Sequence, residues 1–517
     1  MEAIQIQVLP DELANDRLIH VRALERAGVE IEHFPFFKVK KRSIDARKRP
    51  VRYNLSVELL KNIPTSDEQL FESKPFNGKT VHIIGAGPGG LFAALKALEL
   101  GIRPIIFERG KDVRSRRRDL AVLNKEGIVN PESNYCYGEG GAGTYSDGKL
   151  YTRSKKRGDV LKSLQWLVHF GASPDILLDA HPHIGTNKLP DIITAIRDEI
   201  IKHGGEVHFE HKLTDIQHEQ GTITSITIND STNFPCEQLI LATGHSARDI
   251  FDILHRRKIK IVAKGFALGV RIEHNQELID HIQYHGEKSN DLLPPASYSL
   301  VTQVNGRGVY SFCMCPGGIV APCATNQEEV VTNGWSPSKR NNPYSNSGIV
   351  VSLLPEDLPG YSEDNPFNCL DFQKSVEHAC WVAAGQSQAV PAQRMIDFVE
   401  GKLSNDLPKS SYQPGVVSVD LNTILPSIIA DSLKTAFVEF GKKMNGYFTN
   451  EAILHAPESR TSSPISIPRH KETYEHVEIK GLYPCAEGAG YAGGIISAAV
   501  DGMNCMEAIS LKFNLSE

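Results

Sequence analysis

Two glycine-rich segments in distant parts of the chain carry its strongest chemical signal. The first, Gly85-Ala-Gly-Pro-Gly-Gly90, is a G-x-G-x-x-G pattern that directly follows an apolar run. Its first glycine permits a tight turn, the second lets the backbone approach a phosphate, and the third allows a helix to pack closely on its strand. The N–H groups at the start of that helix face the phosphates. The segment therefore predicts a seat for the pyrophosphate of a dinucleotide.

The flanking residues predict the strand–loop–helix–strand unit that such a seat requires. An apolar strand over 79–84 leads into the glycines, and a helix over 90–100 ends at Gly101. A second strand over 104–107 ends in an acid about twenty residues after the first glycine, the usual place of the acid that binds an adenosine ribose hydroxyl. The predicted contacts at this end are Gly85, Gly87, Gly89, Gly90, Glu108 and Arg109.

The second segment, Cys485-Ala-Glu-Gly-Ala-Gly-Tyr-Ala-Gly-Gly494, indicates which dinucleotide binds. A strand over 481–486 reaches an acid, and an apolar helix begins shortly afterwards. In this arrangement the acid binds the ribityl chain of FAD, and the helix N-terminus faces the pyrimidine edge of the flavin, where negative charge gathers on reduction. The acid here is a glutamate, one methylene longer than the usual aspartate. The predicted contacts at this end are Glu487, Gly488, Gly494 and Ile495.

Two segments between these signatures support the same prediction. The stretch 137–149 holds many glycines, which indicates backbone wrapped around a ligand, here the flavin half of FAD; a loop that is merely mobile is the alternative. The apolar run 238–244 ends in Ala-Thr-Gly, a recurrent feature of flavoproteins in which the chain turns beneath the cofactor. The predicted contacts in these segments are Gly140, Gly141, Thr243 and Gly244.

Length and composition are those of a sizeable enzyme. The 517 residues are 40% hydrophobic and 23% charged, which is typical of a globular protein with two or three domains. A net charge of −6 gives no overall attraction to nucleic acid or membranes. No signal peptide or long apolar run is visible, and nine scattered cysteines suit a reducing compartment. We therefore expect a cytoplasmic protein with no membrane partner.

The chain divides into four predicted parts. Residues 1–78 form a small α+β unit, 79–260 the first part of the FAD-binding domain, 261–455 an inserted mixed α+β substrate or cap domain, and 456–517 the rest of the FAD-binding domain. The basic stretch 38–52 favours a solvated hairpin turn, with an anion or RNA contact as the alternative. No second G-x-G-x-x-G opens a helix after a strand, so NAD(P)H, if it is the electron donor, has no dedicated Rossmann site.

Three residues are candidates for catalysis. Arg460, just before the closing strand, is placed to hold an anionic substrate group, with an ion pair to Glu458 or a neighbour as the alternative. Arg271 and His274, at the entry to the inserted domain, are candidates to line the same cavity, with a surface strand as the favoured interpretation. His183 is a candidate proton donor, although a structural hydrogen bond is favoured. His181-Pro-His183 has the alternating spacing of metal ligands, but no third cluster accompanies it, so no metal site is expected.

Cys313-Met-Cys315 is a candidate redox dithiol for relaying electrons from the flavin. On a strand, however, residues two apart share a face, and cysteine commonly serves as a small buried hydrophobe. The C-x-x-x-x-C pair of disulfide reductases does not follow the first glycine segment. Burial is therefore the favoured interpretation of these two thiols.

Several further motifs resemble a family of FAD-dependent dehydrogenase-like proteins, within the NAD(P)/FAD-dependent oxidoreductases. The resemblance covers nearly the whole chain and rests on the segments 138–144, 242–249, 269–274, 311–318, 391–394, 458–464 and 487–494. It implies an α/β fold with a Rossmann-like FAD-binding domain of the glutathione-reductase type, and no particular substrate.

Taken together, these features predict an enzyme that transfers a hydride or electron pair between bound FAD and a small organic molecule. One alternative is a flavoprotein that modifies RNA, suggested by the basic N-terminal stretch. The other is a non-catalytic protein that binds FAD as a structural or sensing ligand.

Overall fold

A five-stranded parallel sheet brings the two glycine-rich segments together. The computed structural model describes residues 3–63, 71–152, 158–286 and 292–515, so residues 64–70, between the N-terminal unit and this sheet, lie outside the described chain. The strand order is β22-β10-β4-β5-β6, and every neighbouring pair is parallel. The strands are β4 (Thr80–Ile84), β5 (Arg103–Phe107), β6 (Glu206–His208), β10 (Leu239–Leu241) and β22 (Leu482–Pro484). Because all five run the same way, the segments that follow β4, β10 and β22 meet at one edge of the sheet.

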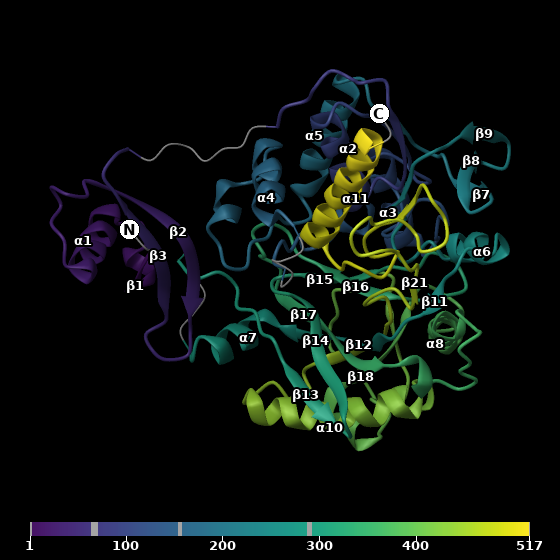
Figure 1. Cartoon of the computed structure of the whole chain (residues 1–517). Helices are drawn as coiled ribbons and strands as arrows, with labels where there is room; N and C mark the ends of the chain where they lie inside the picture. The colour runs from purple at the N-terminus through teal and green to yellow at the C-terminus, as the bar shows by residue number, and fades with distance from the viewer. Residues whose placement is uncertain (1–2, 64–70, 153–157, 287–291, 516–517) are drawn as a thin grey trace.

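Helices α2 (Pro88–Glu99) and α11 (Ile495–Leu515) lie side by side against this sheet (Figure 1). Helix α2 has Pro88 at its first position and is buried from Gly89 to Leu98, as its apolar sequence predicts. It ends at Glu99, and Gly101 follows with φ +74°, which confirms the predicted stop. A Cβ on Gly502 of α11 would lie 2.0 Å from Gly89 O, so the two helices touch through glycine backbone.

The remaining elements of this half cover the sheet and its edges. An antiparallel three-stranded sheet, β7-β8-β9, projects beyond it. The elements are α3 (Val113–Glu126), α4 (Val160–His169), α5 (Leu189–Lys202), β7 (Leu213–Glu219), β8 (Thr222–Ile228), β9 (Thr232–Pro235) and α6 (Arg248–Arg256).

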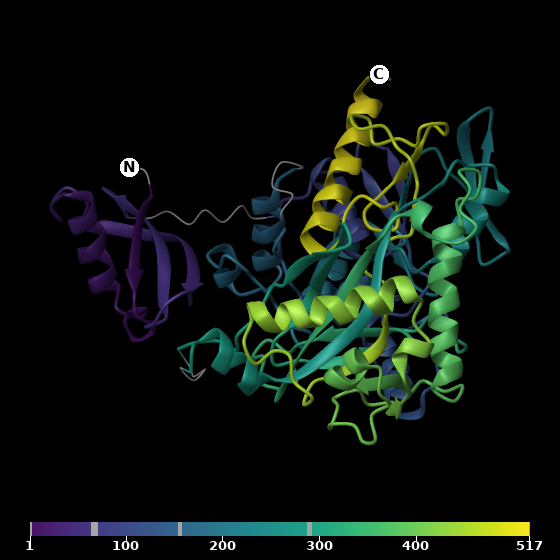
Figure 2. The same cartoon turned by 90° about the horizontal axis from the view of Figure 1, so that it is seen from below.

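A seven-stranded sheet dominates the second half, in the order β13-β14-β17-β12-β20-β18-β19. All its pairs are antiparallel except β18–β19. Helix α10 (Ser427–Lys443) runs across one face of it (Figure 2). The strands are β12 (Phe266–Asn275), β13 (Val301–Val304), β14 (Arg307–Cys315), β17 (Tyr344–Leu353), β18 (Val390–Arg394), β19 (Val416–Ser418) and β20 (Ile453–Glu458). Smaller elements around this sheet are β11 (Val262–Ala263), α7 (Gln276–Gln283), β15 (Ile319–Pro322), β16 (Thr332–Trp335), α8 (Asn368–Ala383), α9 (Met395–Glu400) and β21 (Ile465–Ser466).

The expectation that Arg271 lies on a surface strand is wrong. Strand β12 sits at the centre of the seven-stranded sheet, between β17 and β20, and it is buried from Phe266 to His274. The Arg271 side chain is fully buried there. A central strand covered on both faces does not show the alternation of apolar and polar residues that marks a half-exposed strand. The mixed α/β character of the whole chain is confirmed.

The N-terminal unit has its own sheet, with antiparallel order β1-β3-β2, and is set to one side of the body (Figure 1). Its elements are β1 (Ile4–Val8), α1 (Asp16–Ala27), β2 (Phe36–Asp45) and β3 (Arg52–Leu60). The basic stretch 38–52, predicted as a hairpin turn, forms most of β2 as well as the turn, and its charged residues lie along a strand that is only partly buried. Arg42 joins the unit to the body: its Nε lies 2.7 Å from Asp179 Oδ1, and its backbone N lies 2.8 Å from Leu178 O.

In the described part of the chain, no helix combines the length and the apolar character needed to cross a membrane.

Two buried histidines of the seven-stranded sheet predict acid sensitivity. His455 Nδ1 lies 3.1 Å from Arg271 O, and His274 Nε2 lies 2.9 Å from Tyr447 O. Burial lowers the pKa of each from its ordinary value of 6.5 to about 4. The unfolded chain therefore takes up protons below pH 6.5 while the folded chain does not until about pH 4, so stability falls across that window as the pH falls.

At pH 5 we expect each of these histidines to lower the free energy of unfolding by about 2 kcal/mol relative to pH 7.5. Urea unfolding at the two pH values measures this loss. A His455→Gln variant, which has no ring to protonate, should lose less stability between the two pH values than the wild type does. Equal losses in the two proteins would contradict the assignment.

Candidate functional site

The loop after β4 is built so that backbone packs on backbone. Gly85 has φ +101°, and a Cβ there would lie 2.4 Å from Ala242 O. A Cβ on Gly90 would lie 1.9 Å from Gly85 O. Gly87, which caps α2, differs: its φ is −76°, and of the described residues a Cβ there would meet only Gly141, at 3.9 Å from its Cα. The first and third glycines are thus required by the protein itself, whereas the second leaves open the space that a phosphate needs.

Glu108 ties the neighbouring loops together. Its Oε2 accepts a hydrogen bond from Ala86 N at 2.9 Å, and its Oε1 accepts from Gly110 N at 2.9 Å and from Gly138 N at 3.0 Å. The carboxylate is 5% exposed. It fixes the first glycine loop against the second, and Oε2, which accepts a single hydrogen bond, keeps acceptor capacity for a ribose hydroxyl. That predicted ribose contact stays a prediction.

Arg109 lies beside this acid but is occupied by protein groups. Its guanidinium pairs with Glu132 at 2.7 Å and Asp249 at 2.9 Å, and it stacks over the Tyr137 ring at 4.2 Å. These contacts give Arg109 a structural role, and its predicted contact with the dinucleotide stays a prediction.

The glycine-rich loop 138–144 is held in place by a buried arginine. Arg116 donates from Nη1 to Glu139 O at 2.8 Å, from Nη2 to Tyr135 O at 2.9 Å and from Nε to Asn134 O at 2.8 Å. Gly140 and Gly141 both have positive φ, +77° and +60°. A Cβ on Gly141 would lie 3.2 Å from Gly87 Cα, so this loop rests directly on the first glycine loop.

The other end of the site is formed by the segments after β10 and β22. A Cβ on Gly488 would lie 2.6 Å from Gly244 O, so these two segments touch. The first hydrogen bond of α11 runs from Ala498 N to Gly494 O at 3.0 Å, so the N–H groups of residues 495–497 point beyond the helix start. Gly494 and Gly244 have positive φ. Among the described residues, a Cβ on Gly244 would meet no atom within 4 Å, and one on Gly494 would meet only Ser497 Oγ, at 4.0 Å.

His245, which directly follows Thr243 and Gly244, indicates that a ligand is needed here. Its Nδ1 lies 3.3 Å from Glu487 Oε1 without the angles of a hydrogen bond, and neither ring nitrogen has a hydrogen-bond partner among the described residues. Both nitrogens are buried, and an unsatisfied buried polar group costs about 1–3 kcal/mol. A bound molecule that offers hydrogen bonds beside Glu487 would remove that cost. The ribityl and flavin groups of FAD have suitable donors and acceptors, so the residues present fit FAD.

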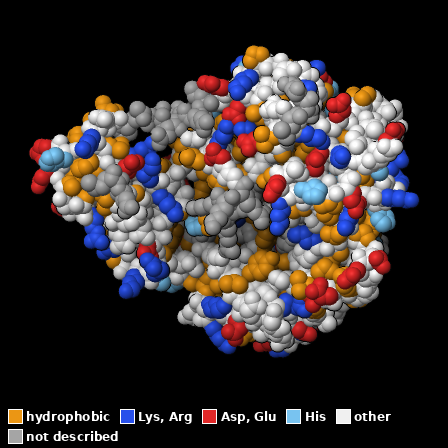
Figure 3. Space-filling view, viewed as in Figure 1, with side chains coloured by type: hydrophobic (Ala, Val, Ile, Leu, Met, Phe, Trp, Pro, Cys, Tyr) orange, Lys and Arg blue, Asp and Glu red, His pale blue; other side chains and the backbone are white. Residues whose placement is uncertain are grey.

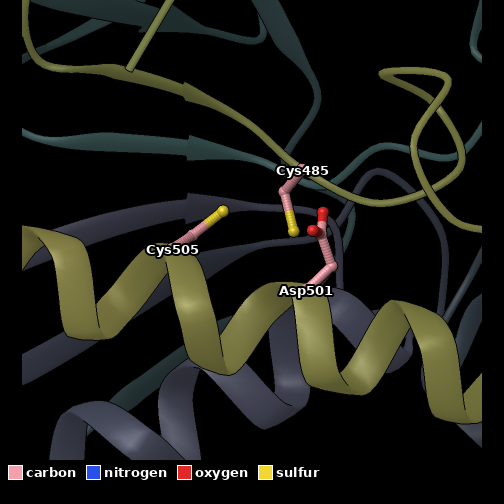
Figure 4. Close-up of side chains that lie close together, drawn as sticks. All are labelled: Cys485, Asp501 and Cys505. Carbon is pink, nitrogen blue, oxygen red and sulfur yellow. The ribbon is translucent and has the colours of Figure 1, made fainter. Parts of the chain in front are cut away.

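The loop that carries Glu487 is positioned by Asp501 of α11. Asp501 Oδ2 accepts from Ala486 N at 2.7 Å, and Arg469 binds both carboxylate oxygens, at 2.6 and 2.9 Å. Figure 4 shows Asp501 pointing to Cys485, with Cys505 one turn further along α11. The ligand atoms of these three residues lie within 4.8 Å of one another, but Arg469 already supplies the positive charge that a metal ion would bring.

The predicted catalytic residue Arg460 belongs to a buried ion-pair network. Its Nη2 lies 2.5 Å from Glu329 Oε1, and its Nε lies 3.2 Å from Glu377 Oε1. Arg248 pairs with the same two acids, at 3.0 and 2.7 Å. Burial alone would lower the pKa of Arg460, but the two carboxylates raise it. Arg460 therefore forms an ion pair, as the alternative interpretation of the sequence predicts, but its partners are Glu329 and Glu377 and not Glu458. A direct substrate contact of Arg460 stays a prediction.

Arg271 and His183 lie in other surroundings. Arg271 binds Glu458 through two hydrogen bonds, at 2.7 and 2.9 Å, and donates to Asn346 Oδ1 at 2.7 Å. His183 Nε2 lies 3.2 Å from Ser338 O, beside a large cavity. Within the described chain no hydrogen bond joins Arg460, Arg271 and His183 to one another.

His245 was not among the predicted residues, although its place directly after the Ala-Thr-Gly turn is a signal that sequence reasoning could have used.

Two family models match the chain. Residues 265–461 match the family described as FAD-dependent protein, C-terminal domain-like, and residues 1–60 match a domain of unknown function, DUF8436. The first match, together with the fit of the residues above, gives FAD as the cofactor.

An uncharacterized protein of Clostridium beijerinckii is 38% identical over 536 aligned positions, covering 99% of each chain.

Solved structures are similar only loosely. FqzB is 13% identical, covers 85% of this chain and 77% of its own, and has a TM-score of 0.34. A geranylgeranyl bacteriochlorophyll reductase-like protein from Thermoplasma acidophilum is 13% identical over 84% of this chain and 80% of its own, with a TM-score of 0.35. CtdE in complex with FAD is 10% identical over 84% and 85%, with a TM-score of 0.32.

Proposed function

The chain belongs to the same family as the Clostridium beijerinckii protein, with a domain of the FAD-dependent kind, and from this premise we propose that it is a FAD-dependent oxidoreductase. In this proposal FAD lies extended along the carboxyl edge of the parallel sheet, as in the glutathione-reductase type, with the pyrophosphate at Gly87 and the flavin near Glu487. When bound, FAD supplies the transfer of a hydride or electron pair to or from a small organic substrate.

The observation that carries the proposal is the environment of His245. Among the described residues neither ring nitrogen of His245 has a hydrogen-bond partner, and this ring, the Glu487 carboxylate and the open start of α11 lie at the same end of the site. The free N–H groups of α11 favour negative charge on whatever lies in front of them. Glu487 accepts hydrogen bonds from the hydroxyl groups of the ribityl chain. His245 donates to or accepts from the same part of FAD and so fixes its orientation. The chain's own contribution is thus to bind, orient and stabilise charge.

The first experiment is the absorption spectrum of the purified full-length protein. We expect a bound yellow flavin that is released as FAD on denaturation. Anaerobic mixing with NADH and with NADPH then tests the electron donor: fast bleaching favours a pyridine-nucleotide-dependent reductase, and slow or absent bleaching favours direct oxidation of an organic substrate. A colourless protein that does not bind added FAD would contradict the proposal.

A His245→Ala variant tests the flavin end specifically. We expect FAD to bind about tenfold more weakly, the effect of losing about 1.4 kcal/mol of hydrogen bonding. The absorption bands of bound flavin should also shift. His255, on α6, is a matched control, because its ring packs on Phe367 away from this site. If His245→Ala binds FAD with the affinity and spectrum of the His255→Ala variant, His245 does not contact the cofactor.

A further inference from the structure

A large cavity lies between the N-terminal unit and the body of the protein, separate from the glycine loops. Its volume is about 2330 Å³, and Figure 3 shows a hollow there with Lys and Arg side chains on the facing surface of the N-terminal unit. The charged residues that line it are Arg42, Arg47, Lys149, Lys339, Arg340, Lys443, Asp11, Asp45 and Asp179. Arg42, Arg47 and Arg340 are ion-paired with Asp179, Asp45 and Asp147. The basic residues that remain are Lys149, Lys339 and Lys443, against Asp11, so the cavity keeps an excess of positive charge and favours a ligand with negative charge.

Cys313 lines this cavity in a strained backbone conformation. It has φ +49°, which is rare for a residue other than glycine. The register between β14 and β17 shifts between Phe312 and Cys315, so Cys313 lies in an irregularity of the strand. The favoured expectation that both thiols are simply buried is wrong for Cys313, which remains partly exposed, and is confirmed for Cys315. Strain of this kind is concentrated at functional sites.

A lysine lies beside both thiols of the Cys313-Met-Cys315 segment. Lys149 Nζ is 3.8 Å from Cys313 Sγ and 3.9 Å from Cys315 Sγ, and it also contacts Met314 O. Lys149 pairs with His183 in an isolated antiparallel bridge, which fixes its backbone at the cavity wall. The Cys315 thiol donates to Cys313 O at 3.3 Å, so the Cys315 sulfur lies next to Cys313.

These contacts favour a thiolate on Cys313. The hydrogen bond from Cys315 lowers the pKa of the Cys313 thiol most, and the positive charges of Lys149 and Arg271 lower it further, against the opposing effect of burial. A thiolate is the nucleophilic form of cysteine. Cys315 is itself buried and keeps its proton more strongly.

We propose that Cys313 is a reactive thiol that undergoes exchange with small anionic disulfides in this cavity, and that Cys315 is its resolving thiol. The Cys313 thiolate attacks one sulfur of the disulfide R–S–S–R, so that the bond from Cys313 to that sulfur forms and one R–S⁻ leaves. Cys315 then passes its proton to water and attacks Cys313 Sγ, which breaks the bond from Cys313 to the sulfur of the R–S group. A Cys313–Cys315 disulfide forms, the second R–S⁻ leaves, and two electrons have passed from the protein to the substrate. The proposal goes beyond the proposed function and does not depend on FAD.

The probe is 5,5′-dithiobis(2-nitrobenzoate), an anionic aromatic disulfide whose released thiolate absorbs visible light. With one equivalent of probe, the wild-type protein is expected to release two equivalents of thiolate in a fast phase and to end without an adduct by mass spectrometry. Cys315→Ser is expected to release one equivalent and to retain the mixed disulfide. Cys313→Ser is expected to lose the fast phase. Lys149→Met should slow it about tenfold, and Lys149→Arg, which keeps the charge, should slow it much less.

Cys136 provides the matched control, because it is the other cysteine that is not fully buried. Cys136→Ser is expected to keep the fast phase and its two equivalents. The cationic disulfide cystamine is expected to react more slowly than the anionic probe. The proposal is overturned if the fast phase survives in Cys313→Ser, if Cys136→Ser abolishes it, or if the wild type stops at one equivalent. Should a variant fail to fold, brief labelling of the wild type with iodoacetamide and peptide mapping must still find Cys313 modified first.

Discussion

An Arg460→Ala variant is expected to lose about 3–5 kcal/mol of the free energy of unfolding. Arg460 and Arg248 together neutralise Glu329 and Glu377, and all four side chains are nearly or fully buried. Removing one guanidinium leaves an excess negative charge inside the protein, where no water can solvate it. Urea unfolding of the two proteins measures the difference. A change of less than about 1 kcal/mol would show that water reaches the network.

A second variant separates this structural role from a catalytic one. Glu377→Gln combined with Arg460→Met restores the balance of charge and should recover at least half of the lost stability. If Arg460 also contacts a substrate, as its position in the sequence predicts, the double variant will remain folded and bind FAD. An activity assay with the identified substrate will then find it inactive. If activity returns with stability, Arg460 serves the fold alone.

A Gly87→Ala variant is expected to bind FAD about 100-fold more weakly while its apoprotein stays within about 1 kcal/mol of the wild type. Within the part of the chain that the structure describes, the new methyl group would meet no atom closer than 3.9 Å. The fold therefore tolerates it, and any loss must come from the space that the pyrophosphate needs. Charge-assisted hydrogen bonds to phosphate contribute about 1.5–3 kcal/mol each, which sets the size of the effect.

Gly90→Ala is the matched control for this experiment. Its Cβ would lie 1.9 Å from Gly85 O, so the loop itself must move, and the apoprotein should lose about 3 kcal/mol of stability. Thermal unfolding of the two apoproteins and FAD titration of each provide the comparison. If the Gly87→Ala apoprotein is destabilised as much as the Gly90→Ala apoprotein, glycine is required at position 87 by the fold and not by the bound pyrophosphate.

The FAD-binding elements could be predicted because their signals are local. The strand, glycine loop and helix from Thr80 to Glu99 lie within twenty consecutive residues, and each glycine has a defined steric reason within that stretch. The second glycine-rich segment, between β22 and α11, is also encoded within a short run of consecutive residues. A parallel sheet then brings such segments to one edge without further information, because the carboxyl ends of parallel strands always meet there.

The partners of the charged and reactive side chains were decided by tertiary structure alone. Arg271 and Glu458 lie 187 positions apart in the sequence, and Arg460 and Glu329 lie 131 apart. Whether Cys313 is inert or reactive depends on Lys149, which reaches it across 164 positions, and on a shift of strand register. Composition and periodicity report only which faces are apolar. Burial, charge pairing and thiol reactivity depend on atoms a few ångströms away that the chain supplies from distant segments, so they follow only from the folded arrangement.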